Sequence, residues 1–544
     1  MKRKQIITLL TVVALTAGML NGCGSNLTKA AQSSSDICTE EAPSEDMGTY
    51  EEPYEYYECE EPAACVETAD TECLEEACYE SEKSYLNDIY DTASVKIPDQ
   101  GSEEYSDIEE VGFKSTKRSP FSTFAADVDT ASYSNMRRML NEGYSVYNLP
   151  EGSVRIEELI NYFSYDYKGP KGRDPFGVNT VIGDCPWNED AKLLSIGLKT
   201  EDIDFEETPD SNLVFLIDVS GSMFSDDKLP LLQDAFCMLV DELSEKDSVS
   251  IVTYAGSDQV VLEGESGDRK RSIKHAINNL EAGGSTNGSA GIITAYELAE
   301  EYFIKGGNNR VILATDGDLN VGLTSVDELE DLISKEKESG VFLSVLGFGS
   351  GNIKDNKMET LADKGNGNYA YIDSIREAEK VLVKELSANF LTVCKDVKFQ
   401  VEFNPEAVKK YRLIGYSNRT MAKKDFDDDS KDGGEIGAGH SVTALYELIL
   451  EEDFDNTLFD LNIRFKRPSS DESELLTYPV DYSAYKKNPG DDFHFQSAVA
   501  EFGLIASNSE YPEDANLEDV LDMLDSINLD DEYKEEFYEI VCKQ

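Results

Sequence analysis

Short apolar runs alternate with amphipathic stretches through the middle of the chain, between about residues 206 and 390. Continuous apolar runs of this length are typical of strands that are buried on both faces of a parallel sheet. They predict strands at 212–219, 248–254, 310–315, 341–348 and 369–372. The amphipathic stretches predict helices at 228–243, 269–280, 289–303, 325–339, 353–362 and 375–388. This alternation indicates an α/β domain at 206–390 with a doubly wound, mostly parallel, Rossmann-like sheet.

The pattern changes on both sides of this domain. Residues 119–205 predict an N-terminal α+β region, in which 154–163 is an amphipathic helix. After residue 391, apolar and polar residues alternate and predict a β-rich module at 391–544, which ends in helices at 493–505, 517–524 and 532–541. Asp127 and Asp129 precede another helix; they suggest a second cation site, but Asp129 is better explained as a helix cap.

The charge is strongly acidic. The 544 residues include 49 Lys plus Arg and 109 Asp plus Glu, which gives a formal net charge of -60. Such a chain repels phosphate backbones and anionic lipid surfaces, so the composition argues against binding nucleic acid through a basic patch. Divalent metals and cationic partners remain compatible with it.

The first residues predict export. Lys2, Arg3 and Lys4 are basic and are followed by an apolar stretch from Ile6 to Leu20, which is too short for an ordinary membrane span. Leu20-Asn21-Gly22-Cys23 resembles a bacterial lipoprotein signal, although Asn21 departs from the usual small residue. The resemblance implies that 1–22 is a signal peptide, that Cys23 receives lipid, and that the protein is anchored on the extracytoplasmic face of the bacterial cell membrane. No later apolar run has spanning length.

Residues 23–118 predict an acidic, disordered stalk. They are rich in Glu, Ser and Tyr and lack apolar periodicity, so they cannot bury enough surface to offset the entropy of ordering. Five cysteines besides Cys23 lie in this segment, and no Cys-x-x-Cys pair occurs in the chain, which gives little support to a zinc or redox motif. Their pairing does not follow from the sequence.

Three polar segments carry the candidate chemistry. Asp218-Val219-Ser220-Gly221-Ser222 follows an apolar strand, a glycine-rich loop with Thr286 opens a helical stretch, and Asp316 follows another apolar strand. Carboxylate and hydroxyl oxygens with few charges suit Mg²⁺, with Mn²⁺ and Ca²⁺ as alternatives. The simpler alternative is that these are turn and capping residues. Together the segments resemble the metal-ion-dependent adhesion site of von Willebrand factor type A domains, which implies that the metal ligands are Asp218, Ser220, Ser222, Thr286 and Asp316.

A second resemblance extends beyond this domain. Four segments are similar to parts of the YfbK-like bacterial lipoproteins: residues 121–133, residues 154–163, Cys185-Pro186-Trp187-Asn188 and residues 433–440. The likeness runs from about residue 120 to the end of the chain.

A Mg²⁺ ion held by these ligands would keep an open position that attracts an oxygen anion, such as a partner's Asp or Glu carboxylate. The resemblance therefore implies a surface lipoprotein that binds a protein or envelope partner through its metal site. The alternatives are a metal-dependent hydrolase and an accessory subunit of an envelope transport or assembly complex. We do not expect an enzyme, because His275, His440 and His494 all lie outside the three motif segments.

Overall fold

The computed structural model describes residues 102–544, except for 127–128, 204–208, 285–288, 318–325, 430, 432, 455–456, 469, 471, 513 and 530. Residues 94–544 belong to one compact unit. The predicted signal peptide with Cys23, and the predicted stalk as far as residue 101, lie outside the described residues. Within the described ranges, no helix is long and apolar enough to cross a membrane.

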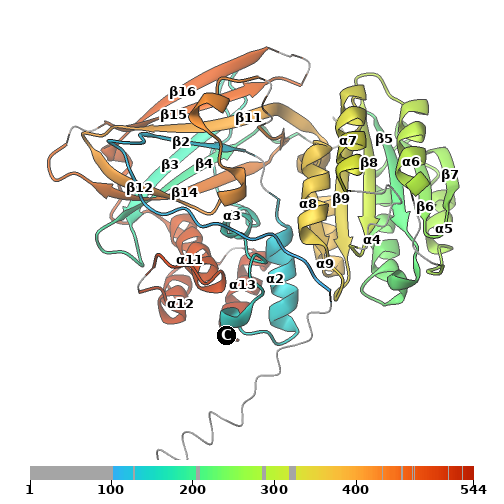
Figure 1. Ribbon diagram of the computed structural model, residues 1–544, viewed down its shortest axis with the longest axis horizontal. Coiled ribbons are helices and arrows are strands. Elements are labelled where there is room, and N and C mark those ends of the chain that lie inside the picture. Colours follow the sequence, from blue (N-terminus) through green and yellow to red (C-terminus); the bar gives the residue numbers. More distant parts are fainter. Residues whose placement is uncertain are drawn as a thin grey trace, which may run out of the picture. The chain divides into compact units, whose positions relative to one another are not determined.

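A six-stranded sheet forms the centre of the α/β domain (Figure 1). Five neighbouring strands are parallel, and β7 pairs with β6 in the antiparallel direction at one edge. The predicted fold class is confirmed, while β7 was not predicted because its residues are mostly half-buried or exposed. In spatial order the strands are β10 (Tyr369–Ile372), β9 (Phe342–Phe348), β8 (Asn308–Thr315), β5 (Ser211–Asp218), β6 (Ser248–Tyr254) and β7 (Asp258–Ser266).

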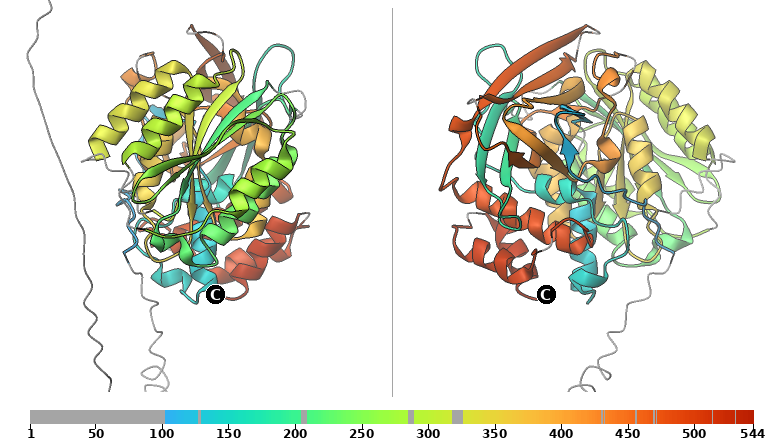
Figure 2. Two further views of the ribbon diagram at one scale, coloured as in Figure 1. Left: turned by 90° about the vertical axis from the view of Figure 1, so that its right-hand side faces the viewer. Right: turned by 60° about the vertical axis from the view of Figure 1, so that its left-hand side comes forward.

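Helices cover both faces of this sheet (Figure 2). Alternate residues of β5 enter two separate cores: Phe215 and Ile217 pack on one face, and Val214 and Leu216 on the other. Since both faces are buried, the strands are apolar throughout, as the sequence indicated. The first face is covered by α4 (Leu229–Glu242), α5 (Lys270–Asn278) and α9 (Ile375–Glu379), and the second by α6 (Ser289–Glu301), α7 (Val326–Glu336) and α8 (Asp355–Lys364).

The segments before and after the α/β domain build one further structure, which we call the companion module (residues 102–203 and 391–544). Its strands form two sheets, and each sheet combines strands from both segments (Figure 1). One sheet has the order β1 (Lys114–Ser115), β12 (Val408–Ile414), β14 (Ser441–Leu450), β4 (Lys192–Lys199) and β3 (Gly177–Asp184). The other has β13 (Ile436–Gly437), β11 (Thr392–Phe403), β15 (Thr457–Lys466) and β16 (Ser473–Asp481), with β2 (Phe121–Ala125) also paired to β11.

The two sheets enclose a single apolar core, in which Phe124 of β2 contacts Phe399 of β11 with ring centroids 5.2 Å apart. A second core lies among the helices and includes Phe163, Phe495 and Phe537. The helices of this layer are α2 (Ala131–Asn141), α3 (Ile156–Asn161), α11 (Asp491–Ala506), α12 (Leu517–Asp525) and α13 (Glu532–Val541). The α/β domain is therefore inserted into the companion module.

The end of the predicted stalk is part of the folded structure. Residues 102–118 include β1, which pairs with β12, and the buried Thr116, whose hydroxyl donates to a backbone carbonyl of Val408 at 2.5 Å. The prediction of disorder was wrong for these residues, because strand pairing and buried hydrogen bonds stabilise a segment that lacks apolar periodicity.

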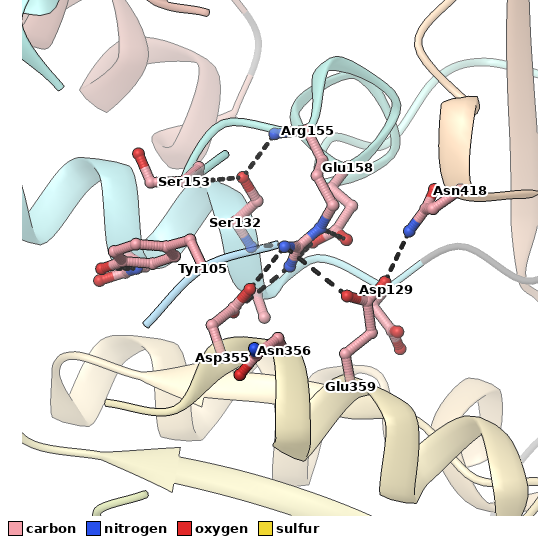
Figure 3. Close-up of polar contacts among 12 residues, drawn as sticks. Tyr105, Asp129, Ser132, Ser153, Arg155, Glu158, Asp355, Asn356, Glu359 and Asn418 are labelled. Carbon is pink, nitrogen blue, oxygen red and sulfur yellow. Dashed lines mark hydrogen bonds and ion pairs between the residues drawn. The ribbon is translucent and has the colours of Figure 1, made fainter. Parts of the chain in front are cut away.

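Buried ion pairs join the companion module to α8 of the α/β domain (Figure 3). Arg155 lies 2.5 Å from Asp355 and also contacts Glu158, and Arg419 lies 3.1 Å from Glu359. Removing one partner of such a cluster would leave a buried charge uncompensated, which is strongly destabilising. These contacts fix the α/β domain against the module into which it is inserted.

Asp129 belongs to this junction. Its carboxylate accepts a hydrogen bond from the backbone N–H of Tyr369 at 2.8 Å and pairs with Arg419 at 3.1 Å. The prediction that Asp129 caps α2 was wrong: the N-cap residue is Thr130, whose side chain makes no capping hydrogen bond, and the Ser132 N–H in the first turn donates to the Glu158 carboxylate at 2.8 Å. Local sequence favours a cap, but the tertiary contacts supply stronger partners. Asp127 lies outside the described residues.

Candidate metal site

The first site segment begins where β5 ends at Asp218, a residue with no exposed surface. One carboxylate oxygen of Asp218 accepts the Ser220 N–H at 2.8 Å, and the other accepts the Thr315 hydroxyl at 3.3 Å. The chain then makes a 3₁₀ turn, Gly221–Phe224, whose Met223 is buried in the core beneath it. A strand end, a short polar turn and an apolar anchor thus hold the motif rigidly.

The other predicted ligands are brought to the same edge of the sheet. The Ser220 and Ser222 hydroxyls lie 2.9 Å apart, and Asp316 is fully buried directly after β8. The Ser222 hydroxyl also hydrogen-bonds Asp316 and contributes to lowering its pKa. Four of the five predicted ligands are therefore gathered as the motif spacing indicated.

Thr286, the fifth predicted ligand, lies outside the described residues, but the loop that leads to it is placed. The Gly283 N–H donates to the Val219 carbonyl at 2.8 Å, and the Gly221 N–H donates to the Gly284 carbonyl at 3.3 Å. The glycine-rich loop is thus hydrogen-bonded to the first site segment up to two residues before Thr286.

The two carboxylates have opposite pKa shifts. Burial, together with the nearby charge of Asp316, raises the pKa of Asp218 to about 6. Burial opposes ionisation of Asp316 as well, but hydrogen bonds from Lys228 and Asn352 outweigh it and lower the pKa of that carboxyl group. The site therefore has one firmly ionised carboxylate and one whose ionisation a bound cation would favour.

Lys228 and Asn352 were missed by sequence reasoning. The Lys228 ammonium donates to Asp316 and to the Asn352 side-chain carbonyl, both at 2.9 Å. Gly349 makes room for Lys228: its φ is +74°, and a Cβ atom there would lie 2.3 Å from the lysine Cγ. The available signal was Gly349-Ser350-Gly351-Asn352 after β9, since site loops follow parallel strands at this edge.

The residues present fit a hard divalent cation. Two carboxylates are buried here, of which Asp316 pairs with the Lys228 ammonium at 2.9 Å, and the neighbouring donors are hydroxyl oxygens, which match the ligands that Mg²⁺ prefers. Among the described residues there is no group of three or more His, Cys, Asp or Glu side chains placed to hold a metal. A cation here would consequently depend on Ser220 and Ser222 as well as on Asp218 and Asp316.

Comparisons with known proteins agree with the fold of the α/β domain. The family model "von Willebrand factor type A domain" matches residues 212–384, "von Willebrand factor" matches 99–195, and "Uncharacterized protein YfbK, C-terminal" matches 388–458 and 450–544. The uncharacterized protein YfbK of Escherichia coli K12 is 42% identical over 444 residues, which cover 77% of this chain and 76% of that protein. The chain belongs to the YfbK family of von Willebrand factor type A domain proteins.

More distant similarities cover only parts of the relatives or carry low scores. Human inter-alpha-trypsin inhibitor heavy chain H3 is 26% identical over 164 residues, 29% of this chain and 18% of that protein. A solved structure, von Willebrand factor type A from Catenulispora acidiphila, has 14% identity and a TM-score of 0.42, and covers 70% of this chain and 91% of that one. Von Willebrand factor type A domains mediate protein interactions and typically bind a divalent metal.

Proposed function

We propose that this protein is a binding module that recognises a carboxylate of a protein or envelope partner through a divalent metal, most simply Mg²⁺. The observation that carries the proposal is the convergence of Asp218, Ser220, Ser222 and Asp316 at the carboxyl edge of the sheet. With Thr286 these residues would hold the metal. When bound, the metal would supply a positive charge and an open position for the partner's oxygen.

A binding role is preferred to catalysis. In the described part of the chain, His275 lies on α5, His440 lies between β13 and β14, and His494 lies on α11, so none of the three belongs to a segment that carries a candidate ligand. A hydrolase would need a base within hydrogen-bonding reach of its reacting water or substrate.

The rim of the site offers an apolar contact to the partner. Phe224, two residues after Ser222, is 80% exposed, whereas the adjacent Met223 is completely buried and anchors the turn. An aromatic side chain on a rigid turn provides contact area at a low cost in conformational entropy. Within the proposal, the metal binds the partner's carboxylate and Phe224 packs against a neighbouring apolar group.

We also propose that the protein is a lipoprotein, anchored by lipid on Cys23 at the extracytoplasmic face of the cell membrane. The basic, apolar and Leu-Asn-Gly-Cys segments at residues 1–23 support this location. The folded unit would then stand outside the membrane, where the metal site faces envelope partners.

Metal binding is tested by calorimetric titration of the folded protein with MgCl₂ and MnCl₂. Asp218→Ala should weaken binding about 100-fold, and Ser222→Ala about tenfold, because loss of a charged ligand costs more than loss of a neutral one. Asp226→Ala, an exposed aspartate of the same loop, is the matched control and should bind as the parent does. If a well-folded parent binds neither metal at millimolar concentration, the site assignment is wrong.

Partner binding is tested by crosslinking on intact cells with and without EDTA. Capture should require both the metal and Asp218, and Phe224→Ser should reduce capture several-fold while metal affinity stays at the parent value. If EDTA does not reduce capture of the partner, then recognition does not depend on the metal site.

A further inference from the structure

The first described residues lie against the α/β domain. Residues Ser102–Tyr105, which we call the entry segment, lie along the loop between β9 and α8, Gly349–Lys354. Three backbone hydrogen bonds join them: Ser102 N–H to the Gly351 carbonyl at 2.8 Å, Glu104 N–H to the Ile353 carbonyl at 2.8 Å, and Asp355 N–H to the Glu104 carbonyl at 3.1 Å. Figure 3 shows Tyr105 beside Asp355 and Asn356 at the start of α8.

Glu103 is the central side chain of the entry segment. Its side chain is only 3% exposed, and its carboxylate accepts the Gly351 N–H at 2.8 Å. Both of its oxygens also lie 3.1 Å from the Arg138 guanidinium on α2, and the Tyr105 hydroxyl donates to it at 2.8 Å. Glu103 is thus fixed by the companion module and in turn holds the backbone of Gly351.

The opposite side of the same loop touches the metal site. Asn352 accepts from Lys228, whose ammonium pairs with Asp316. Gly317, next to Asp316, is packed so closely that a Cβ atom there would lie 2.7 Å from the Lys354 nitrogen and 2.8 Å from the Asn352 carbonyl oxygen. One short loop therefore contacts the entry segment on one side and the surroundings of a metal ligand on the other.

We propose that Glu103 is a positioning residue for the metal site and that the entry segment is coupled to metal binding through the Gly349–Lys354 loop. With this loop held, Asn352 and Lys228 keep Asp316 in place. Since the predicted stalk continues into the entry segment, a change at the stalk reaches the metal site through this packed loop. The inference rests on the proposed function, because it requires that the site binds a metal.

Coupling between two sites is reciprocal, so bound metal must stabilise the entry segment. Hydrogen exchange of the parent should show slower exchange at the amides of Ser102, Glu104 and Gly351 when MgCl₂ is added. Asp218→Ala should show no such change. A parent that binds Mg²⁺ with unchanged exchange at these amides would overturn the coupling but not the metal site, whereas a parent that binds no Mg²⁺ would overturn the proposed function itself.

Variants of Glu103 distinguish a role in positioning the metal site from a role in stabilising the fold alone. Glu103→Ala should weaken Mg²⁺ binding about fivefold, and Glu103→Gln, which keeps an acceptor for Gly351, should restore part of it. Glu109→Gln, an exposed glutamate of the same stretch, is the matched control. A merely structural role would lower the melting temperature of Glu103→Ala and leave its Mg²⁺ affinity at the parent value, and that result would overturn the proposal.

Discussion

Asp218 shows how a single residue type takes its role from its surroundings. Its carboxylate is completely buried, and in the described contacts one oxygen accepts a backbone N–H and the other a hydroxyl. Burial raises its pKa to about 6, while hydrogen bonds from Lys228 and Asn352 lower the pKa of Asp316. The two carboxylates of one site are thus unequal, and Asp218 is the one whose charge depends on pH near neutrality.

Metal binding should therefore depend on pH through Asp218. A metal binds the ionised carboxylate, and a group with a pKa of about 6 is mostly ionised at pH 7.5 and mostly protonated at pH 5. The Mg²⁺ affinity should fall as the pH is lowered through about 6, and it should be roughly tenfold weaker at pH 5 than at pH 7.5. Calorimetric titration at the two pH values measures this. An affinity that is unchanged between them would contradict the raised pKa.

At the scale of elements, the companion module depends on strands that are far apart in the chain. β4 pairs with β14 over eight residue pairs, from Lys199 with Ser441 to Lys192 with Leu448. β2 pairs with β11, and β1 with β12. Without the C-terminal strands, β3 and β4 would remain only as a two-stranded hairpin, which is marginally stable in water.

A chain that ends after Phe390 should accordingly lose the fold of its N-terminal region. Residues 102–203 should become sensitive to protease, whereas 209–384 should resist it, because the six-stranded sheet keeps its own strands and both helix layers. Limited proteolysis with mass spectrometry, with the full chain as control, distinguishes the two segments. Equal resistance of 102–203 in both chains would show that this region folds without its partner strands.

At the scale of the whole molecule, the α/β domain is held by charge as well as by the chain connections on either side. Arg155 and Arg419 of the companion module face Asp355, Asp129 and Glu359 in a buried cluster. Arg137 adds contacts to Asp373 at 2.5 Å and Glu377 at 2.7 Å. In a chain with a net charge of -60, these arginines compensate carboxylates where solvent cannot.

The proposed anchor is also a property of the whole molecule. Cys23→Ser removes the thiol that would receive lipid, so the variant should leave the membrane fraction or keep its signal peptide uncleaved. Cell fractionation and mass measurement of the N-terminus report both outcomes, and Cys38→Ser serves as the matched control. A Cys23→Ser protein that is processed and sediments with membranes as the parent does would contradict the anchor.

The sequence by itself determined the α/β domain and the position of most of the candidate site residues. Alternating apolar and amphipathic runs specify strands and helices, because these periodicities depend on neighbours within a few positions. Asp218, Ser220, Ser222 and Asp316 were predicted as ligands from their resemblance to a metal-ion-dependent adhesion site. The structure gathers them because each stands at or just after the end of an apolar strand, and parallel strands end at one edge of a sheet.

Only the tertiary structure decided the remaining contacts. Three of these contacts join residues that are distant in the chain: Lys228 with Asp316, Glu103 with Gly351, and Asp129 with Tyr369. No local pattern distinguishes Lys228, Glu103 or Asp129 from ordinary surface or capping residues. The same holds for the pairing of β4 with β14. Such contacts form because burial in a common structure supplies their partners, and burial depends on how the whole chain is folded.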